Sequence, residues 1–296
     1  MDDALPPLKR PVRATADDSA LALAGMLGGD SVLAGARPAE NPGPLKFQYR
    51  VLKALVLREM SARHGESRLG YLMGIILPLI TISVLILVFE VRGRVFPSDF
   101  SMGVFVITGY PLWQAFNGTY KGVMGAASKS DPLLMFPQIT QLDLILANII
   151  LETVTSTVTY AIMVVGALIV FPDTLPADPV GIMMCFWACI WLGAGLGLVL
   201  CGVMRLAPMI AKVINSFMRL GMWMSGVMFA ANKLPPWSWP YLKWNPLLHC
   251  IDGARHLWKP TFDAPIFDPF YIVSVGFVLT AFGFILERAT RRFVGP

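Results

Sequence analysis

Six long apolar stretches dominate this sequence and limit what the chain can fold into. Each stretch is long enough to cross about 30 Å of hydrocarbon as an α-helix. Only 15% of the residues are charged, compared with about 25% in an average soluble domain, and the alternating pattern of barrel strands is absent. We therefore predict an all-α membrane protein whose six transmembrane helices cover Leu69–Glu90, Phe100–Tyr120, Leu142–Phe171, Val180–Met204, Ile210–Ala230 and Phe270–Leu286.

The basic residues beside these stretches predict the orientation of the chain. Cytoplasmic loops of membrane proteins carry an excess of lysine and arginine. With the N-terminus inside, twelve such residues flank the spans on the cytoplasmic side and six on the outer side. Six spans then place both termini in the cytoplasm. The net charge of +5 follows mostly from this asymmetry and favours anionic lipid, not nucleic acid, as a neighbour.

The chain before the first span divides into two segments of different composition. Residues 1–44 are rich in Ala, Asp, Gly and Pro and predict a flexible cytoplasmic tail. Residues 45–68 show helical periodicity, with an apolar stripe that includes Val51 and Leu55, which predicts an amphipathic helix in the membrane interface. This helix either anchors the chain or lines the approach of an anionic, lipid-linked substrate. The candidate residues for the second interpretation are Arg58, Arg63 and Arg68.

The loop after the second span carries an apolar group, "DPLLMFP", on the predicted cytoplasmic side. Exposed apolar residues on such a loop indicate a contact with another protein. Asp131 and Pro132 can also begin a helix, as N-cap and N1 residue. We interpret residues 129–136 as a docking segment, and the alternative is a simple elbow that starts the third helix.

The predicted outer region, residues 232–267, is rich in tryptophan and proline. Its prolines predict several short helices that re-enter the outer leaflet, and "NPLLHCIDGARHLW" predicts one with Asn245 as N-cap and Pro246 at N1. Aromatic side chains at this depth form an interface belt or contact sugar rings, and both interpretations stay open. The candidate residues are Trp237, Trp239, Tyr241 and Trp244.

Three features inside the spans predict contacts between helices. The fifth span carries a polar stripe of Lys212, Asn215 and Arg219. Charges within the bilayer are costly and normally face protein or a wet cavity, so Glu152, with Asn148 one turn earlier, is the expected partner of one of these cations. Gly193 and Gly197 form a GxxxG pattern, which favours close packing of two helices.

Catalytic and metal-binding patterns are weak in this chain. It contains no GxxxxGK[ST] motif, so it does not hold ATP in a P-loop, and no GxSxG or HExxH motif. Cys185, Cys189 and Cys201 lie in the fourth span as small apolar residues. His249 and His256 share a helical face with an aspartate, but no further ligands accompany them, so we assign no metal site and no catalytic residue.

Four segments resemble, in order and spacing, landmarks of one transporter family. They are "LREMSARHGESRLGYL", "ITGYPLWQAFNGTYKGVM", "DPLLMFPQITQLD" and "WNPLLHCIDGARHLW". From about Leu45 to the C-terminus the chain is similar to the membrane subunit of type-2 ABC exporters, specifically the capsular polysaccharide export permeases. Its tail of 44 residues is longer than is usual there, and Met73 stands where relatives often have an aromatic residue.

The resemblance implies a non-enzymatic permease subunit in a bacterial inner membrane. Such a permease forms a homodimer bound to two copies of a separate ABC ATPase, which holds ATP and Mg²⁺, and works with periplasmic and outer-membrane export components. The cargo implied is an acidic polysaccharide on a lipid terminus. The implied coupling helix falls on Lys129, Asp131, Pro132, Leu133, Leu134 and Phe136.

The resemblance also suggests which residues line the path of the glycan. Beyond the three arginines before the first span, the cationic candidates are Lys212 and Arg219. The aromatic candidates are Tyr71, Trp113, Phe116 and Trp223. Three alternatives stay open: export of O-antigen or another lipid-linked glycan, a membrane-embedded transferase that uses the cluster of His249, Asp252 and His256, and a receptor or scaffold without flux.

Overall fold

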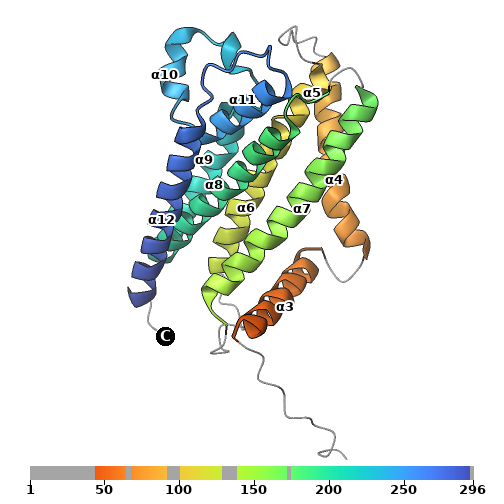
Figure 1. The fold of residues 1–296 in the computed structure, drawn as a ribbon. Helices are drawn as coiled ribbons and strands as arrows, with labels where there is room; N and C mark the ends of the chain where they lie inside the picture. The colour runs from red at the N-terminus through yellow and green to blue at the C-terminus, as the bar shows by residue number, and fades with distance from the viewer. Residues whose placement is uncertain (1–43, 65–67, 92–100, 129–138, 172–174, 294–296) are drawn as a thin grey trace, which may run out of the picture. The chain divides into compact units, whose positions relative to one another are not determined.

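The computed structural model of the protein describes residues 44–64, 68–91, 101–128, 139–171 and 175–293. Within these ranges the chain is helical and contains no strand, which confirms the all-α prediction (Figure 1). Residues Arg50–Pro296 form one compact unit. The described α-helices are α3 (Pro44–His64), α4 (Arg68–Val91), α5 (Met102–Ile107), α6 (Tyr110–Ser128), α7 (Gln141–Val170), α8 (Pro179–Leu206), α9 (Pro208–Met224), α10 (Trp239–Leu242), α11 (Pro246–Trp258) and α12 (Pro269–Phe293).

Three of the helices in the described ranges are long and apolar enough to cross a membrane. They are α7, α8 and the segment Pro269–Thr290 of α12. Helix α4 contains a shorter apolar segment, Leu72–Val88. The first, third and fourth predicted stretches agree with α4, α7 and α8 to within two residues at either end.

Two of the predicted stretches are not continuous helices. The second divides into α5 and α6 at Thr108 and Gly109. Pro111 explains the break, because its nitrogen carries no hydrogen and cannot bond to the carbonyl of Ile107, so it is accommodated in the first turn of a new helix. The fifth stretch ends as a helix at Met224, and the chain then turns through Gly226, whose φ is +82°.

Helix α8 packs along both α6 and α12, and α6 packs in turn against α7. The GxxxG pattern of α8 lies at its contact with α6. A Cβ atom added to Gly193 would lie 2.6 Å from the carbonyl oxygen of Phe116, and one added to Gly197 would lie 3.0 Å from that of Tyr120. The prediction of close helix packing at these two glycines is confirmed.

Helix α11 begins as the sequence predicts. The side chain of Asn245 accepts a hydrogen bond from the Leu247 N–H at 3.1 Å, and Pro246 occupies the first helical position. The helix packs against α8 and α12 (Figure 1). Before it lie the 3-10 helices η2 (Ala231–Lys233) and η3 (Pro236–Ser238) and the single turn α10, in agreement with a series of short helices.

Helix α3 ends at His64, four residues before the end of the predicted interface helix. Its apolar stripe contacts protein: Leu55 is buried against Leu144 and Ala147 of α7. Val51 lies partly buried against the same small cluster. Part of the apolar stripe that predicted contact with lipid thus packs against the start of α7.

Candidate functional site

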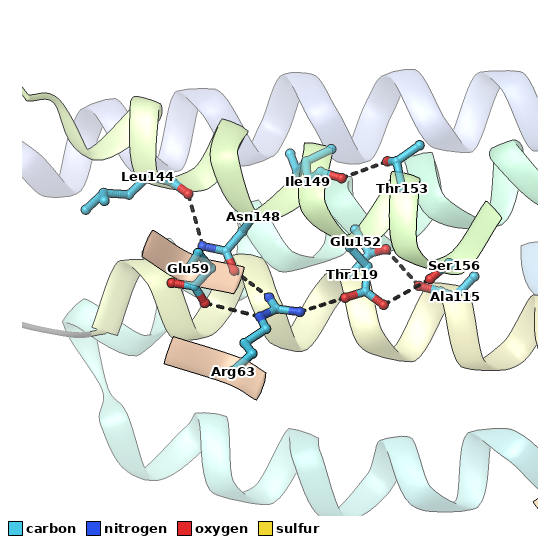
Figure 2. A network of polar contacts seen from close by, with 10 residues as sticks. All are labelled: Glu59, Arg63, Ala115, Thr119, Leu144, Asn148, Ile149, Glu152, Thr153 and Ser156. Carbon is cyan, nitrogen blue, oxygen red and sulfur yellow. Dashed lines mark hydrogen bonds and ion pairs between the residues drawn. The ribbon is translucent and has the colours of Figure 1, made fainter. Parts of the chain in front are cut away.

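A polar network joins the end of α3 to the N-terminal half of α7, and Arg63 lies at its centre (Figure 2). The guanidinium group donates to Glu152 Oε2 at 2.8 Å and to Asn148 Oδ1 at 2.5 Å. It also contacts Glu59 Oε1, one turn earlier on α3, at 3.2 Å. The Arg63 side chain is 28% exposed and that of Glu152 is 15% exposed, so the pair lies between the surface and the interior.

The sequence of α7 arranges its half of this network. Asn148, Glu152 and Ser156 are spaced four residues apart and therefore share one helical face. Asn148 Nδ2 donates to the Leu144 carbonyl at 3.1 Å, which leaves its oxygen free for Arg63. The Ser156 hydroxyl donates to Glu152 Oε1 at 3.1 Å and fixes the carboxylate from the other side.

Two glycines on α6 leave the space that the ion pair occupies. A Cβ atom added to Gly118 would collide with the Glu152 carboxylate, and one added to Gly122 would lie 2.7 Å from Arg63 Nη2. Their GxxxG spacing was visible in the sequence but was not interpreted. The contact between Glu59 and Arg63 was also predictable, because residues four positions apart on one helix face each other and can form an ion pair.

Among the described residues Glu152 pairs with Arg63, a partner that the sequence did not suggest. The sequence suggested a cation of the fifth span, whereas the structure pairs Glu152 with Arg63 of α3. The side chains of Lys212 and Arg219 lie outside the described residues, and so do those of Arg68 and Tyr71. The coupling residues at 129–136 are likewise outside the described ranges.

Two cavities meet at the Arg63–Glu152 pair. One, of about 160 Å³, lies between α4, α6 and α7 and reaches Tyr160. The other, of about 400 Å³, lies between α3, α6 and α7 and includes Lys121. Because both cavities are lined by Arg63 and Glu152, an anion that displaced Glu152 from the guanidinium would open a path between them. The ion pair can therefore hold α3 on α7 until an anionic group displaces Glu152 from Arg63.

The aromatic residues proposed for a glycan path do not share one surface. Trp113 and Phe116 are buried in the core of the bundle, with their ring centroids 5.9 Å apart. Trp223 is exposed on α9. Arg58 is exposed on α3, five residues before Arg63. A shared conduit role for these four residues stays a prediction.

The outer aromatic residues gather around α10. Trp237, Tyr241 and Trp244 are 73%, 77% and 79% exposed, whereas Trp239 is half-buried and donates to the Ala231 carbonyl at 3.2 Å. A cavity of about 650 Å³ adjoins Trp244 and is lined by His249, Asp268 and Tyr271 among others. Exposed aromatic faces beside this hollow suit either of the two interpretations, interface belt or sugar contact.

The histidines of α11 hold the outer segments together. His249 Nε2 lies 2.9 Å from the Lys243 carbonyl, and its Nδ1 accepts from the Asp268 N–H at 3.2 Å, which fixes the neutral tautomer with hydrogen on Nε2. Burial lowers the pKa of His249. His256 Nδ1 lies 2.8 Å from the Phe262 carbonyl. No group of three metal-ligating side chains occurs among the described residues.

Helix α11 also buries a charged pair that sequence reasoning missed. Arg255 is fully buried, lies 3.7 Å above the ring centroid of Phe105, and donates to the Phe229 carbonyl at 3.0 Å. Burial lowers the pKa of Arg255 to about 9 and raises that of Asp252 to about 6, and each charge partly offsets the shift of the other. Arg255 links α11 to Phe105 of α5 and to the Phe229 carbonyl, which marks it as a structural residue.

Comparison with known proteins places these features in a family context. The profile of the family described as "ABC-2 type transporter" matches residues 50–258. The chain is 27% identical over 252 residues to the capsule polysaccharide export inner-membrane protein CtrC of Neisseria meningitidis serogroup B, covering 85% of this chain and 95% of CtrC.

Two further relatives are similar at nearly the same identity. The polysialic acid transport protein KpsM of Escherichia coli is 26% identical over 244 residues, covering 82% of this chain and 94% of KpsM. The capsule polysaccharide export inner-membrane protein BexB of Haemophilus influenzae is 24% identical over 213 residues, covering 72% of this chain and 80% of BexB. The similarity to each of the three relatives thus extends over most of both proteins.

Proposed function

The chain belongs to the ABC-2 type transporter family, and we propose that it is the membrane permease subunit of an ATP-driven exporter of capsular polysaccharide. The cargo that we propose is an acidic glycan on a lipid terminus, which crosses the bacterial inner membrane. ATP and Mg²⁺ act in a separate ATPase subunit. The observation that carries the proposal is the similarity to CtrC, KpsM and BexB, which extends over 80–95% of their lengths.

The proposed topology has six spans and cytoplasmic termini. Helices α7, α8 and α12 supply three spans by length and apolar character alone. Helix α4, the pair α5 and α6, and helix α9 supply the other three, and the excess of basic residues on the predicted inner side supports the orientation. Exposed apolar side chains along α4, α9 and α12 are available for lipid or for the second copy of a homodimer.

The Arg63 network supports an acidic cargo. Arg63 lies at the predicted cytoplasmic end of the bundle, where a lipid-linked glycan made in the cytoplasm would arrive. A sugar carboxylate or a lipid phosphate is a stronger ligand for guanidinium than an amide such as Asn148, and it competes directly with Glu152. We propose that arrival of this anion releases α3 from α7, and that Arg58 extends the cationic approach.

The partners are proposed from the family. Two copies of an ABC ATPase dock on the loop at 129–136, with Leu133 and Leu134 as apolar contacts, and periplasmic and outer-membrane components receive the glycan. Export of O-antigen is the alternative cargo. The three relatives reported above include two named for capsule polysaccharide export and one for polysialic acid transport, which favours capsule.

Deletion of the gene tests the proposed function. We expect polysaccharide to disappear from the cell surface and to accumulate in the cytoplasm, and we expect the wild-type gene to restore it. Staining of surface and lysate fractions with a capsule-specific reagent measures both pools. Unchanged surface capsule together with a loss of O-antigen would transfer the proposal to the alternative cargo, and no change in either glycan would refute export.

A further inference from the structure

The cavity between α4, α6 and α7 is lined by polar groups that form no hydrogen bond within the described part of the chain. Its volume is about 160 Å³, and its lining includes Gly74 and Pro78 of α4, Gln114 of α6, and Thr155 and Tyr160 of α7. The Arg63–Glu152 pair lines one end. The other end reaches Met163, so the cavity follows α7 for about three turns.

Three buried side-chain atoms at this cavity have no hydrogen-bond partner within the described part of the chain. They are Gln114 Oε1, Thr155 Oγ1 and Tyr160 OH. Buried polar groups are almost always paired, and an unpaired one destabilises the fold, so three around one hollow need a physical reason. A ligand that bonds to them would supply that reason.

A fourth polar group comes from the backbone of α4. Pro78 lies inside this helix and has no N–H, so the helical hydrogen bond to the carbonyl of Gly74 is missing. Both residues line the cavity. Because Gly74 has no side chain, its carbonyl is a further candidate acceptor for a ligand in the cavity.

The four groups define the chemistry of the ligand. The oxygens of Gln114 and Gly74 only accept, whereas the hydroxyls of Thr155 and Tyr160 both donate and accept. This set suits neutral hydroxyl groups, which also donate and accept. A phosphate is a poor match for these four groups, because none of them is cationic, and Arg63, the one cationic side chain in the described lining, lies beside Glu152 instead.

The size of the cavity fits one sugar unit. One water occupies about 30 Å³ in the liquid, so a cavity of about 160 Å³ holds about five waters, or one hydroxylated ring in their place. We propose that this cavity binds a single hydroxyl-rich sugar ring in the membrane domain, beside an anion held at Arg63. The identity of that sugar as part of a lipid-linked glycan rests on the proposed function, whereas the binding chemistry does not.

Photolabelling in lipid nanodiscs tests the proposal on the full chain. The probe is octyl β-D-glucoside with a diazirine in its alkyl chain, and the matched probe is its tetra-O-methyl form, which keeps the ring but loses the hydroxyl donors. Mass spectrometry quantifies labelled peptides from α4 and α7. We expect saturable labelling near Gly74 and Tyr160 with the glucoside and little with the methylated probe.

The variant Thr155→Val with Tyr160→Phe removes both unpaired hydroxyls and keeps the side-chain shapes. Folding is not expected to suffer, because neither oxygen bonds to described protein atoms and the Tyr160 ring keeps its stacking on Phe186, with centroids 4.5 Å apart. Loss of two neutral hydrogen bonds weakens binding by about tenfold. Thr153→Val is the control, since that hydroxyl bonds to the Ile149 carbonyl and its side chain lines a different, apolar cavity.

Three results would overturn the proposal. They are equal labelling by the glucoside and the methylated probe, equal labelling of the double variant and the control, and stronger labelling of the same peptides by a photoreactive phosphatidylglycerol, which would identify a lipid head group. The proposed function fails separately: sugar labelling in a protein that exports nothing refutes export and leaves the site, whereas export without labelling refutes the site alone.

Discussion

The ion pair between Arg63 and Glu152 is the contact whose strength the structure predicts most directly. Its N–O distance is 2.8 Å, and the side chains are 28% and 15% exposed. Fully exposed pairs contribute about 0.2–1 kcal/mol, and breaking a fully buried pair costs about 3–5 kcal/mol. We therefore expect a coupling free energy of about 1–2 kcal/mol between these two side chains.

A double-mutant cycle measures this coupling. The variants are Arg63→Met, Glu152→Gln and the combination, each in nanodiscs, and hydrogen exchange of the peptide 50–64 reports the opening of α3. A coupling of 1–2 kcal/mol corresponds to about 5- to 30-fold faster exchange when the pair is broken. Because the contact fixes α3 on α7, the effect should be confined mainly to these two helices.

Lys53→Met is the matched control for the cycle. It removes one cation from an exposed position of the same helix, ten residues before Arg63. We expect its exchange to stay within about twofold of the wild type. The reasoning is refuted if Arg63→Met and Lys53→Met change the exchange equally, or if the coupling falls below about 0.3 kcal/mol.

Two further predictions concern helix packing and the outer helices. Gly193→Ala should destabilise the protein by about 1–3 kcal/mol in thermal unfolding, because the new Cβ would lie 2.6 Å from the Phe116 carbonyl oxygen. Gly166→Ala is the control. It should be neutral or stabilising in the same assay, because a Cβ at that position meets no atom of another part of the described chain within 4 Å. His249 has a lowered pKa and accepts from the Asp268 N–H, so the folded state resists its protonation. The contribution of His249 to stability should therefore fall by up to about 1.4 kcal/mol per pH unit as pH drops below about 6.5. The variant His249→Gln should remove this contribution, measured as the difference between thermal unfolding at pH 7.5 and at pH 5.5. An unchanged difference would contradict the assignment.

Local features of the fold were predictable because they depend on nearby residues. The Asn245–Pro246 cap predicted the start of α11 to the residue. The apolar stretches predicted α7 and α8 closely. The break between α5 and α6 also has a local signal, because Pro111 inside an apolar run favours the start of a new helix. The break was nevertheless not predicted, because the whole stretch is apolar and long enough for one span.

The candidate site depends on contacts between distant residues and was only partly predictable. Arg63 and Glu152 were each selected for their charge, but they are 89 residues apart in the chain, and pairing them requires the packing of α3 on α7. The cavity beside them had no sequence signal at all. Gln114, Thr155 and Tyr160 are ordinary residues for a membrane helix, and their significance comes only from the absence of a described hydrogen-bond partner.

Co-purification with the ABC ATPase of the proposed exporter tests the central claim most directly. The wild type should retain the ATPase in stoichiometric amount, Leu133→Asp should lose it, and Leu175→Asp, at an exposed position of the predicted outer loop, should retain it. That pattern would establish an ABC permease whose coupling segment includes residue 133. Absence of the ATPase from the wild type, or its full retention by Leu133→Asp, would contradict the account.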